Sequence, residues 1–434
     1  MGVNNRQRRK AKKQQRQQRQ HGPSATRSFA SGRSQSGDRH VDGVQSARDG
    51  VLLAVEVFRS GSTAAYQMAL GELAVVGERV GSEAVHQATV WWTDRGLDRA
   101  WSTGWQPGDV MRFVRRELTA RHADAIGACV AAGGGRQRDA TLDDRWASQV
   151  AAIADACPST PDFGPGSPSL PLAVEALSVL LYLPSIPRLS TAPGRTRRAG
   201  GPDQTAMLER VRALLAKAES TTFPEEAESL TAKAQQLMAR HAIDAAMLDA
   251  GQGVGSGAVV AWRIGIDDPY TDGKSLLLHH IAVANRSKAV WCKPLGSSTV
   301  FGSRSDLEMV ELLFTSLLVQ ATEPMLRAGR SVDRYGRSRT TSFRKSFLAA
   351  YAIRIGHRLA SATASAVVEG TERHGDALLP VLAGRAEEVD GAVRDVFPET
   401  CARATTITNH SGWVAGQAAA DLARLGVGDE LAAG

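Results

Sequence analysis

Residues 208–244 read LERVRALLAKAESTTFPEEAESLTAKAQQLMARHAID, and this stretch predicts two helices joined by a short turn. Apolar residues recur at helical spacing before and after the turn, over 205–219 and from 224 to about 240. Thr222 and Glu225 stand at capping-box spacing, and Pro224 falls in the first turn, where its missing N–H costs nothing. The stretch therefore predicts an αα-hairpin within residues 204–250.

The hairpin resembles the bacterial family catalogued as domain of unknown function 2786, whose pattern is helix, (T/S)xxPEEA, helix and LM. Weaker similarity to the companion domain of that family runs through FGSRSDLEMVELLFTSLLVQ (301–320) and SFRKSFLAAYAIRIGHRL (342–359). The resemblance implies domain boundaries and a cytoplasmic bacterial setting. It implies no activity and assigns no catalytic residues.

After the hairpin, residues 256–426 predict an α+β domain. Short segments rich in Val, Ile and Trp, bounded by Gly, Pro or Asp, predict strands at 258–266, 288–293 and 298–301. The segments between and after them predict helices at about 270–286, 304–327, 341–368 and 411–424. The result is a small sheet covered by long helices.

Before the hairpin, we expect a disordered basic tail over 1–48 and a helical bundle over 49–157. The bundle holds five of the eight tryptophans, which are expected in its core. Residues 158–203 are rich in Pro, Gly and Arg and read as linkers around one apolar helix at 172–183. The whole chain is thus expected to be α+β and predominantly helical.

Positive charge is concentrated at the start of the chain. The 434 residues carry 52 Lys+Arg against 45 Asp+Glu, a net charge of +7. Residues 1–20 contain no acid and eight bases, which are Arg6, Arg8, Arg9, Lys10, Lys12, Lys13, Arg16 and Arg19. The remainder is close to neutral, so the high isoelectric point describes the tail.

Cysteine spacing and hydropathy indicate a cytoplasmic protein without a membrane segment. The four cysteines lie far apart and form no CxxC pair, as is typical of buried or incidental thiols in a reducing compartment. The apolar stretch 172–183 contains Glu175 and is too short to cross a bilayer.

The segment 330–359 is the strongest candidate for binding an anion. A basic loop precedes a helix on which three arginines fall within the apolar arc that Phe343 and Tyr351 help to form. These guanidiniums either pair with Asp306, Glu308 or Glu311 or line a cleft for phosphate. The candidate residues are Arg334, Arg337, Arg339, Arg344, Arg354 and Arg358.

Gly302 and Ser303 form a second anion candidate, because they join a predicted strand to the start of a predicted helix. The alternative is that this turn caps itself, since Ser305 and Glu308 stand at capping-box spacing. A third basic feature is the stripe of Arg112, Arg115 and Arg116 beside Trp101 and Trp105, which reads as a solvated face or as a nucleic-acid surface.

Other features favour structural roles. His279 and His280 are adjacent and too divergent on a helix to share a metal, so we expect one to be packed and one exposed. Asn409 is expected to cap a helix, on which Gly412, Gly416 and Ala420 mark a close-packing face. P-loop, HExxH and GxSxG motifs are absent, and we assign no catalytic residue, metal or cofactor.

Three functions follow from these patterns. The favoured one is a non-enzymatic binding protein whose basic tail contacts nucleic acid or another polyanion. The first alternative is an enzyme that acts on a phosphorylated or nucleic-acid substrate in the arginine-lined cleft. The second alternative is a protein–protein module that presents an apolar face of the hairpin or bundle to a partner.

Overall fold

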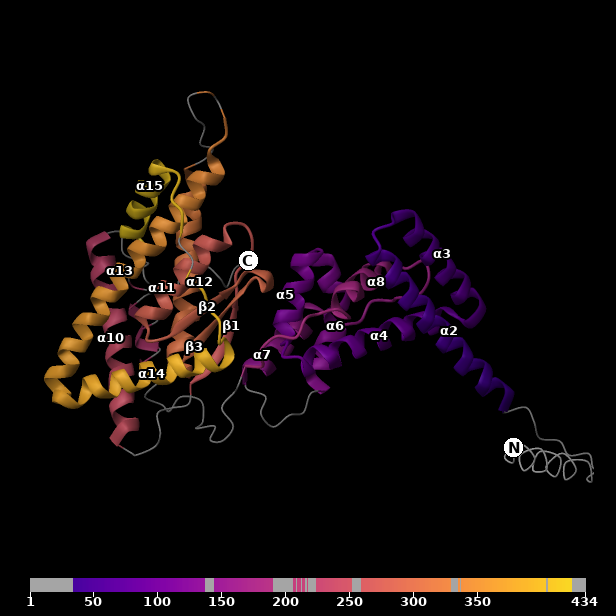
Figure 1. Cartoon of the computed structure of the whole chain (residues 1–434), viewed down its shortest axis with the longest axis horizontal. Helices are drawn as coiled ribbons and strands as arrows, with labels where there is room; N and C mark the ends of the chain where they lie inside the picture. The colour runs from indigo at the N-terminus through magenta and orange to yellow at the C-terminus, as the bar shows by residue number, and fades with distance from the viewer. Residues whose placement is uncertain are drawn as a thin grey trace, which may run out of the picture.

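The chain folds into two lobes that lie side by side (Figure 1). The computed structural model describes residues 34–136, 144–189, 206–251 apart from 208, 212, 215, 216 and 218–223, and then 259–328, 335, 337–402 and 405–423. Within these residues, helices predominate and one three-stranded antiparallel sheet is present. The predicted fold class, predominantly helical α+β, is confirmed.

The N-terminal lobe is a helical bundle around one apolar core. Trp101, Trp105 and Trp146 are buried in this core, each less than a tenth exposed, as the sequence predicts, whereas Trp91 and Trp92 are only partly buried. The helices of the lobe are α2 (Ser34–Arg59), α3 (Thr63–Val80), α4 (Ser82–Ser102), α5 (Pro107–Glu117), α6 (Ala120–Arg136), α7 (Asp144–Ala156) and α8 (Ser169–Leu180).

Two predictions for this lobe were wrong in their bounds. Helix α2 begins at Ser34, inside the segment expected to be disordered up to residue 48. Its residues 43 and 47 are buried, and Gly43 faces Val80 of α3, so tertiary packing compensates for the polar composition. Helix α8, expected between linkers, belongs to the bundle because Leu170 and Leu177 are buried in the same core.

The C-terminal lobe contains the sheet. Its strands are β1 (Val260–Gly265), β2 (Lys288–Cys292) and β3 (Ser297–Gly302), in the order β1-β3-β2. In the antiparallel register, Trp262 pairs with Val300 on the one side, and Ala289 pairs with Val300 on the other. The short 3₁₀ turn η1 (Lys293–Leu295) connects β2 to β3.

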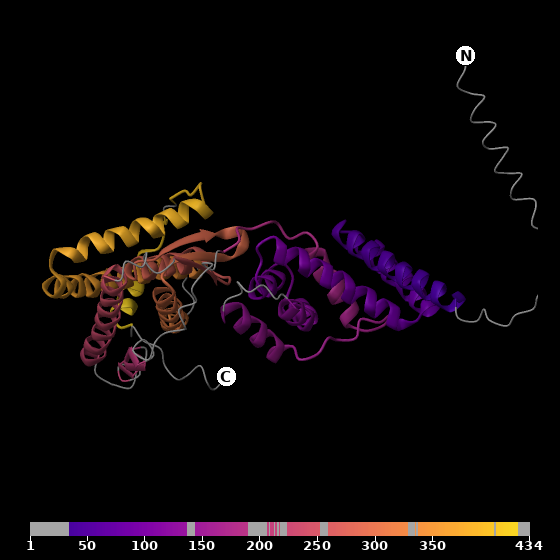
Figure 2. The ribbon, with the colours of Figure 1, turned by 90° about the horizontal axis from the view of Figure 1, so that it is seen from below.

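Helices cover both faces of the sheet (Figure 2). Trp262 and Val300 pack with α11, α12 and α13, whereas Ala261 and Phe301 on the opposite face pack against Val389 of α14. The helices of this lobe are α10 (Pro224–Gly251), α11 (Thr271–Ala284), α12 (Arg304–Arg327), α13 (Thr340–His374), α14 (Leu378–Val396) and α15 (His410–Asp421), with the 3₁₀ turn η2 (Gly375–Ala377) between α13 and α14.

Helix α15 packs closely against α13, as its small residues predict. A Cβ atom added to Gly412 or Gly416 would lie about 3 Å from the carbonyl carbon of Phe343 or Phe347, respectively. Asn409 caps the helix as expected, because its side-chain oxygen accepts the Gly412 N–H at 2.9 Å. The close packing of α15 on α13 brings the C-terminal end of α15 to Arg354 and Arg358 of α13.

No helix in the part of the chain that the structure describes combines the length and apolar character that a membrane span requires. The Cys residues at 129, 157, 292 and 401 are all free.

Candidate functional site

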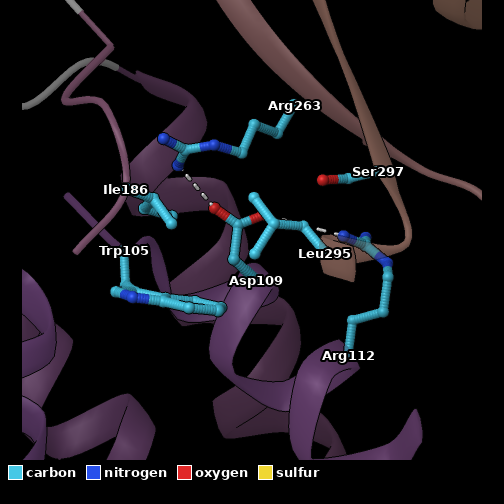
Figure 3. Close-up of a pocket in the computed structure, with 7 residues that line it drawn as sticks. All are labelled: Trp105, Asp109, Arg112, Ile186, Arg263, Leu295 and Ser297. Atoms are coloured by element: carbon cyan, nitrogen blue, oxygen red, sulfur yellow. Dashed lines mark hydrogen bonds and ion pairs between the residues drawn. The ribbon is translucent and has the colours of Figure 1, made fainter. Parts of the chain in front are cut away.

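The two lobes meet at a buried ion pair between β1 and α5 (Figure 3). Arg263 is 4% exposed and donates to Asp109 Oδ2 at 2.8 Å and to the Gly104 carbonyl at 2.9 Å. It also donates to the Pro187 carbonyl. Arg112 lies 3.6 Å from the other carboxylate oxygen of Asp109. The buried charges are therefore compensated from several sides, as a buried ion pair requires.

Local sequence positions both partners. Asp109 is in the first turn of α5 behind Pro107, where the helix dipole favours a carboxylate. Arg263 shares a face of β1 with Ala261 because side chains alternate along a strand. Ala261 packs with Phe301 and α14, whereas Arg263 extends to the N-terminal lobe.

A second set of contacts extends the seam between the lobes. Both terminal nitrogens of Arg145 on α7 bind Glu311 on α12, at 2.6 and 2.8 Å. The same guanidinium lies 4.5 Å from the centre of the Trp262 ring. Arg304 bonds to Asp144 at 2.9 Å. These forked and stacked contacts fix the orientation of the lobes.

The cavity at this seam is lined by Trp105, Asp109, Arg112, Ile186, Arg263, Leu295 and Ser297. Its interior has room for about one water molecule. A pocket that encloses a drug-sized ligand has a volume of roughly 300 Å³ or more. The contacts at the seam therefore hold the two lobes together, and the arginines there bind groups of the protein itself.

Two of the three helix arginines that were predicted to line a phosphate cleft also bind groups of the protein itself. Arg354 Nε lies 2.5 Å from Asp421, and Arg358 donates to the carbonyls of Ala420 and Ala423 at the end of α15. Cations are favoured there because unpaired carbonyls end a helix. The prediction of a phosphate cleft around these two arginines was therefore wrong, because α15 lies against that side of α13.

The carboxylates offered as alternative partners were also assigned wrongly. Glu311 pairs with Arg145, Asp306 with Arg286 at 3.3 Å, and Glu308 with Arg304 at 3.5 Å. The prediction considered only the preceding helix, whereas Arg354 and Arg358 bind the end of α15. The partners of the acids come from α7, from the turn after α11 and from α12 itself.

The remaining candidates of this segment have different environments. Arg344 is half-buried, and its Nε has no hydrogen-bond partner in the described structure. Arg337 and Arg339 are exposed before α13. Arg334 and the eight bases of residues 1–20 lie outside the described residues.

The turn at Gly302 and Ser303 caps a helix. Ser303 Oγ accepts the Asp306 N–H at 3.2 Å and donates to the Asp306 carboxylate at 2.7 Å. Capping therefore uses Ser303 and Asp306, and the expected pair Ser305 and Glu308 was wrong. Because the Asp306 carboxylate already occupies this helix start, the geometry gives no support to an anion site there.

One of the two adjacent histidines is exposed and the other is packed, as predicted. His279 is exposed, and His280 packs against Gly356 of α13 with its Nε2 buried and without a partner. Burial lowers the pKa of His280, and the neighbouring His279 and His357 lower it further. Among the described side chains, no group of His, Cys, Asp or Glu is arranged to hold a metal.

The stripe of Arg112, Arg115 and Arg116 faces acids. Arg112 lies beside Asp109 as above, Arg115 lies 3.7 Å from Asp124, and Arg116 lies 3.8 Å from Glu117 and bonds to the Lys293 carbonyl. These neighbours neutralise the stripe and leave it little attraction for a nucleic acid.

A different cluster, which sequence reasoning missed, combines an aromatic ring with cations. The guanidiniums of Arg48 on α2 and Arg95 on α4 lie 4.1 and 5.0 Å from the centre of the Trp91 ring. Neither has a carboxylate within ion-pair distance among the residues described. We call Arg48, Trp91 and Arg95 the tryptophan–arginine cluster. The spacing of Trp91 and Arg95 by four residues was its only sequence signal.

Comparison with known proteins identifies one segment. The family described as "Protein of unknown function (DUF2786)" matches residues 206–245. This segment includes most of α10, whose Ala234, Met238 and Ile243 are buried in the C-terminal lobe. The whole chain resembles no curated protein and no solved structure significantly. The family predicted from the hairpin is thus confirmed over this segment, and the chain carries a DUF2786 sequence at residues 206–245.

Proposed function

We propose that this chain is a nucleic-acid-binding protein that contacts the phosphate backbone through residues 1–20. The observation that carries the proposal is the distribution of charge. Eight bases without an acid precede a remainder that is close to neutral. Such a segment binds phosphates with little dependence on sequence and strong dependence on salt.

The folded lobes support this assignment by elimination. Many of their arginines lie within ion-pair distance of a carboxylate, and these are Arg112, Arg115, Arg116, Arg136, Arg145, Arg263, Arg286, Arg304, Arg354 and Arg373. The enzyme hypothesis requires an arginine-lined cleft, but two of the three helix arginines bind the end of α15 instead. In the sequence, the densest run of bases without an acid is therefore the tail.

The tryptophan–arginine cluster offers a second contact on the folded surface. A guanidinium that lies over the face of an indole ring has its N–H groups in its own plane, and these can still bond to a phosphate. Trp91 and Arg48 are half-buried and Arg95 is exposed. The cluster lies on α2 and α4, and α2 is the first described helix after the tail.

The protein–protein alternative rests on exposed apolar side chains, such as Met68 and Val75 on α3. Nothing in the structure identifies a partner for them, so we do not favour this function. The free cysteines agree with the cytoplasmic location that we infer together with nucleic-acid binding.

The test is a salt titration with a fluorescent single-stranded RNA of about twenty nucleotides. If about five tail bases contact phosphates, the logarithmic slope is about −3.5, and raising salt from 50 to 200 mM weakens binding roughly a hundredfold. The matched control replaces the eight bases of residues 1–20 with Gln at constant length.

We expect the Gln variant to lose most of the affinity and most of the salt slope. Arg95→Ala should weaken binding by a smaller factor, with Arg79→Ala as a control on another exposed helix position. Equal affinity of the Gln variant and the natural chain would contradict the proposal. Binding of heparin without binding of RNA would also contradict it, and would show that the ligand is a polyanion other than nucleic acid.

A further inference from the structure

A hydroxyl, an imidazole and a carboxylate form a hydrogen-bonded chain at the start of α6. Thr119 Oγ1 lies 2.7 Å from His122 Nδ1, and His122 Nε2 lies 2.8 Å from Glu175 Oε2. Thr119 and His122 belong to the turn before α6 and to its first turn, whereas Glu175 comes from α8, 53 residues further along. Tertiary packing therefore assembles the three groups.

The chain of bonds fixes the direction of proton donation. An ionised carboxylate only accepts hydrogen bonds, so the proton of the neutral ring is on Nε2 and points to Glu175. Nδ1 then carries the lone pair and accepts the O–H of Thr119. In this arrangement the imidazole can remove the hydroxyl proton while the carboxylate stabilises the imidazolium that forms.

The two ends of this chain differ in exposure, since the Glu175 side chain is 22% exposed whereas Thr119 lies on the surface. His122 is 8% exposed, and Tyr66, which donates to the Pro171 carbonyl at 3.3 Å, is 5% exposed. Burial raises the pKa of Tyr66, and the negative charge of Glu175 raises it further, so the phenol stays neutral beside the carboxylate. Thr119 is exposed to solvent. A reactant would therefore reach the hydroxyl more readily than the carboxylate.

The hydroxyl of Thr119 differs from an ordinary helix cap. Ser62, which precedes α3 in the same lobe, accepts the Ala65 N–H with its side chain. Thr119 instead bonds to the imidazole, and its carbonyl accepts the N–H groups of His122 and Ala123. The first N–H groups of a helix have no partner within the helix, and those of residues 120 and 121 belong to the helix start that directly follows Thr119.

We propose that Thr119, His122 and Glu175 form an acyl-transfer site that hydrolyses carboxylic esters through an acyl-Thr119 intermediate. Thr119 Oγ bonds to the ester carbonyl carbon as its proton moves to His122 Nδ1. The bond from that carbon to the leaving oxygen then breaks, and His122 returns the proton to the leaving alkoxide. Water attacks the acyl group, His122 accepts the water proton, and Thr119 recovers it as the carboxylic acid leaves.

Helix N–H groups near the hydroxyl provide the electrostatic part of this reaction. The carbonyl oxygen becomes negative when Thr119 attacks, and preorganised donors at a helix start stabilise that charge. The proposal goes beyond nucleic-acid binding and does not depend on it, because none of its three residues belongs to the tail or to the tryptophan–arginine cluster.

The experiment uses p-nitrophenyl acetate with the full chain. It measures p-nitrophenolate release and, after an acid quench, acetyl groups on the peptides that contain Thr119 and Ser62. General-base catalysis contributes roughly 10²–10⁴-fold. We therefore expect Thr119 to be acetylated at least a hundredfold faster than Ser62 within the same molecules. If the acetyl group is instead hydrolysed quickly, we expect steady p-nitrophenolate release that Thr119→Ala abolishes.

Variants separate catalysis from folding. Thr119→Ser keeps a hydroxyl and should retain acetylation, and His122→Gln should slow it about a hundredfold. Ser62→Ala should leave the rate of Thr119 acetylation unchanged. Glu175→Gln keeps the shape of the carboxylate and should slow the reaction at least tenfold. Acetylation of Thr119 no faster than that of Ser62 in the natural chain, together with p-nitrophenolate release that Thr119→Ala leaves unchanged, would overturn the proposal. The first of these two measurements requires no variant.

Discussion

Replacing Gly416 with Ala should loosen helix α15 from helix α13. The new Cβ would lie 2.9 Å from both the carbonyl carbon and the Cα of Phe347, and closer still to the Phe347 oxygen. These are backbone atoms of a long, well-packed helix, so they cannot rotate away as a side chain can. Helix α15 must move outward by roughly an ångström, since ordinary contacts to carbon are about 3.5 Å.

The magnitude follows from two opposing effects. Overpacking of this kind costs about 1–3 kcal/mol, and the backbone contact places Gly416→Ala at the upper end. Ala gains about 1 kcal/mol over Gly in a helix interior. The net loss is therefore about 2 kcal/mol, which corresponds to a roughly thirtyfold larger population of the state in which α15 is detached.

Hydrogen–deuterium exchange of α15 measures this population directly. Amides of α15 should exchange about thirtyfold faster in Gly416→Ala, while those of α4 in the other lobe keep their rates. Gly384 is the matched control, because it lies inside helix α14 with nothing within 4 Å of its added Cβ. Gly384→Ala should slow exchange in α14 by a few-fold. Unchanged or slower exchange of α15 in Gly416→Ala would refute the reasoning.

Three further outcomes are expected. Asp109→Ala leaves the Arg263 guanidinium, whose side chain is 2% exposed, without its carboxylate, so urea unfolding should lose about 3–5 kcal/mol. The double variant with Arg263→Ala should recover part of that loss, and additive losses would contradict the pairing. Burial lowers the pKa of His280, so its contribution to stability is complete above about pH 6.5 and is lost as pH falls toward the lowered value. The melting temperature of the natural chain should therefore fall more between pH 7 and pH 5 than that of His280→Gln, and parallel curves would exclude this effect. Burial raises the pKa of Cys129 to about 11, so iodoacetamide at pH 8 should alkylate exposed Cys401 first, and equal rates would show that Cys129 is accessible.

The strands were the most predictable part of the fold. Segments such as 288–293 carry Val and Trp and are bounded by polar residues and Pro294, so local propensity and tertiary context agree. Helix α14 was not predicted, because Pro380, Gly384 and Gly391 interrupt its pattern. It is stabilised by packing of Val389 against Phe301 on one face of the sheet, a contact that no local window of sequence contains.

The arginines show why the candidate site was harder to predict than the fold. The sequence places Arg354 and Arg358 on the apolar arc of a helix, which correctly indicates that their charges require partners. It does not indicate that the partners are Asp421 and the last carbonyls of α15, more than sixty residues away. The same holds for Arg263, whose carboxylate belongs to the other lobe, 154 residues earlier.

The distribution of these partners decides where function is to be sought. In the described part of the C-terminal lobe, Arg354 and Arg358 bind the end of α15, and Arg263 joins β1 to α5. The segment that matches DUF2786 belongs to this lobe, and its buried residues there are largely apolar. The tail, the tryptophan–arginine cluster and the Thr119 hydroxyl instead belong to, or precede, the N-terminal lobe. Because the seam ties the lobes together through compensated buried charges, a ligand held by the N-terminal lobe would carry the DUF2786 segment with it as one body. The family match and the proposed chemistry are therefore properties of different lobes that the Arg263–Asp109 pair joins.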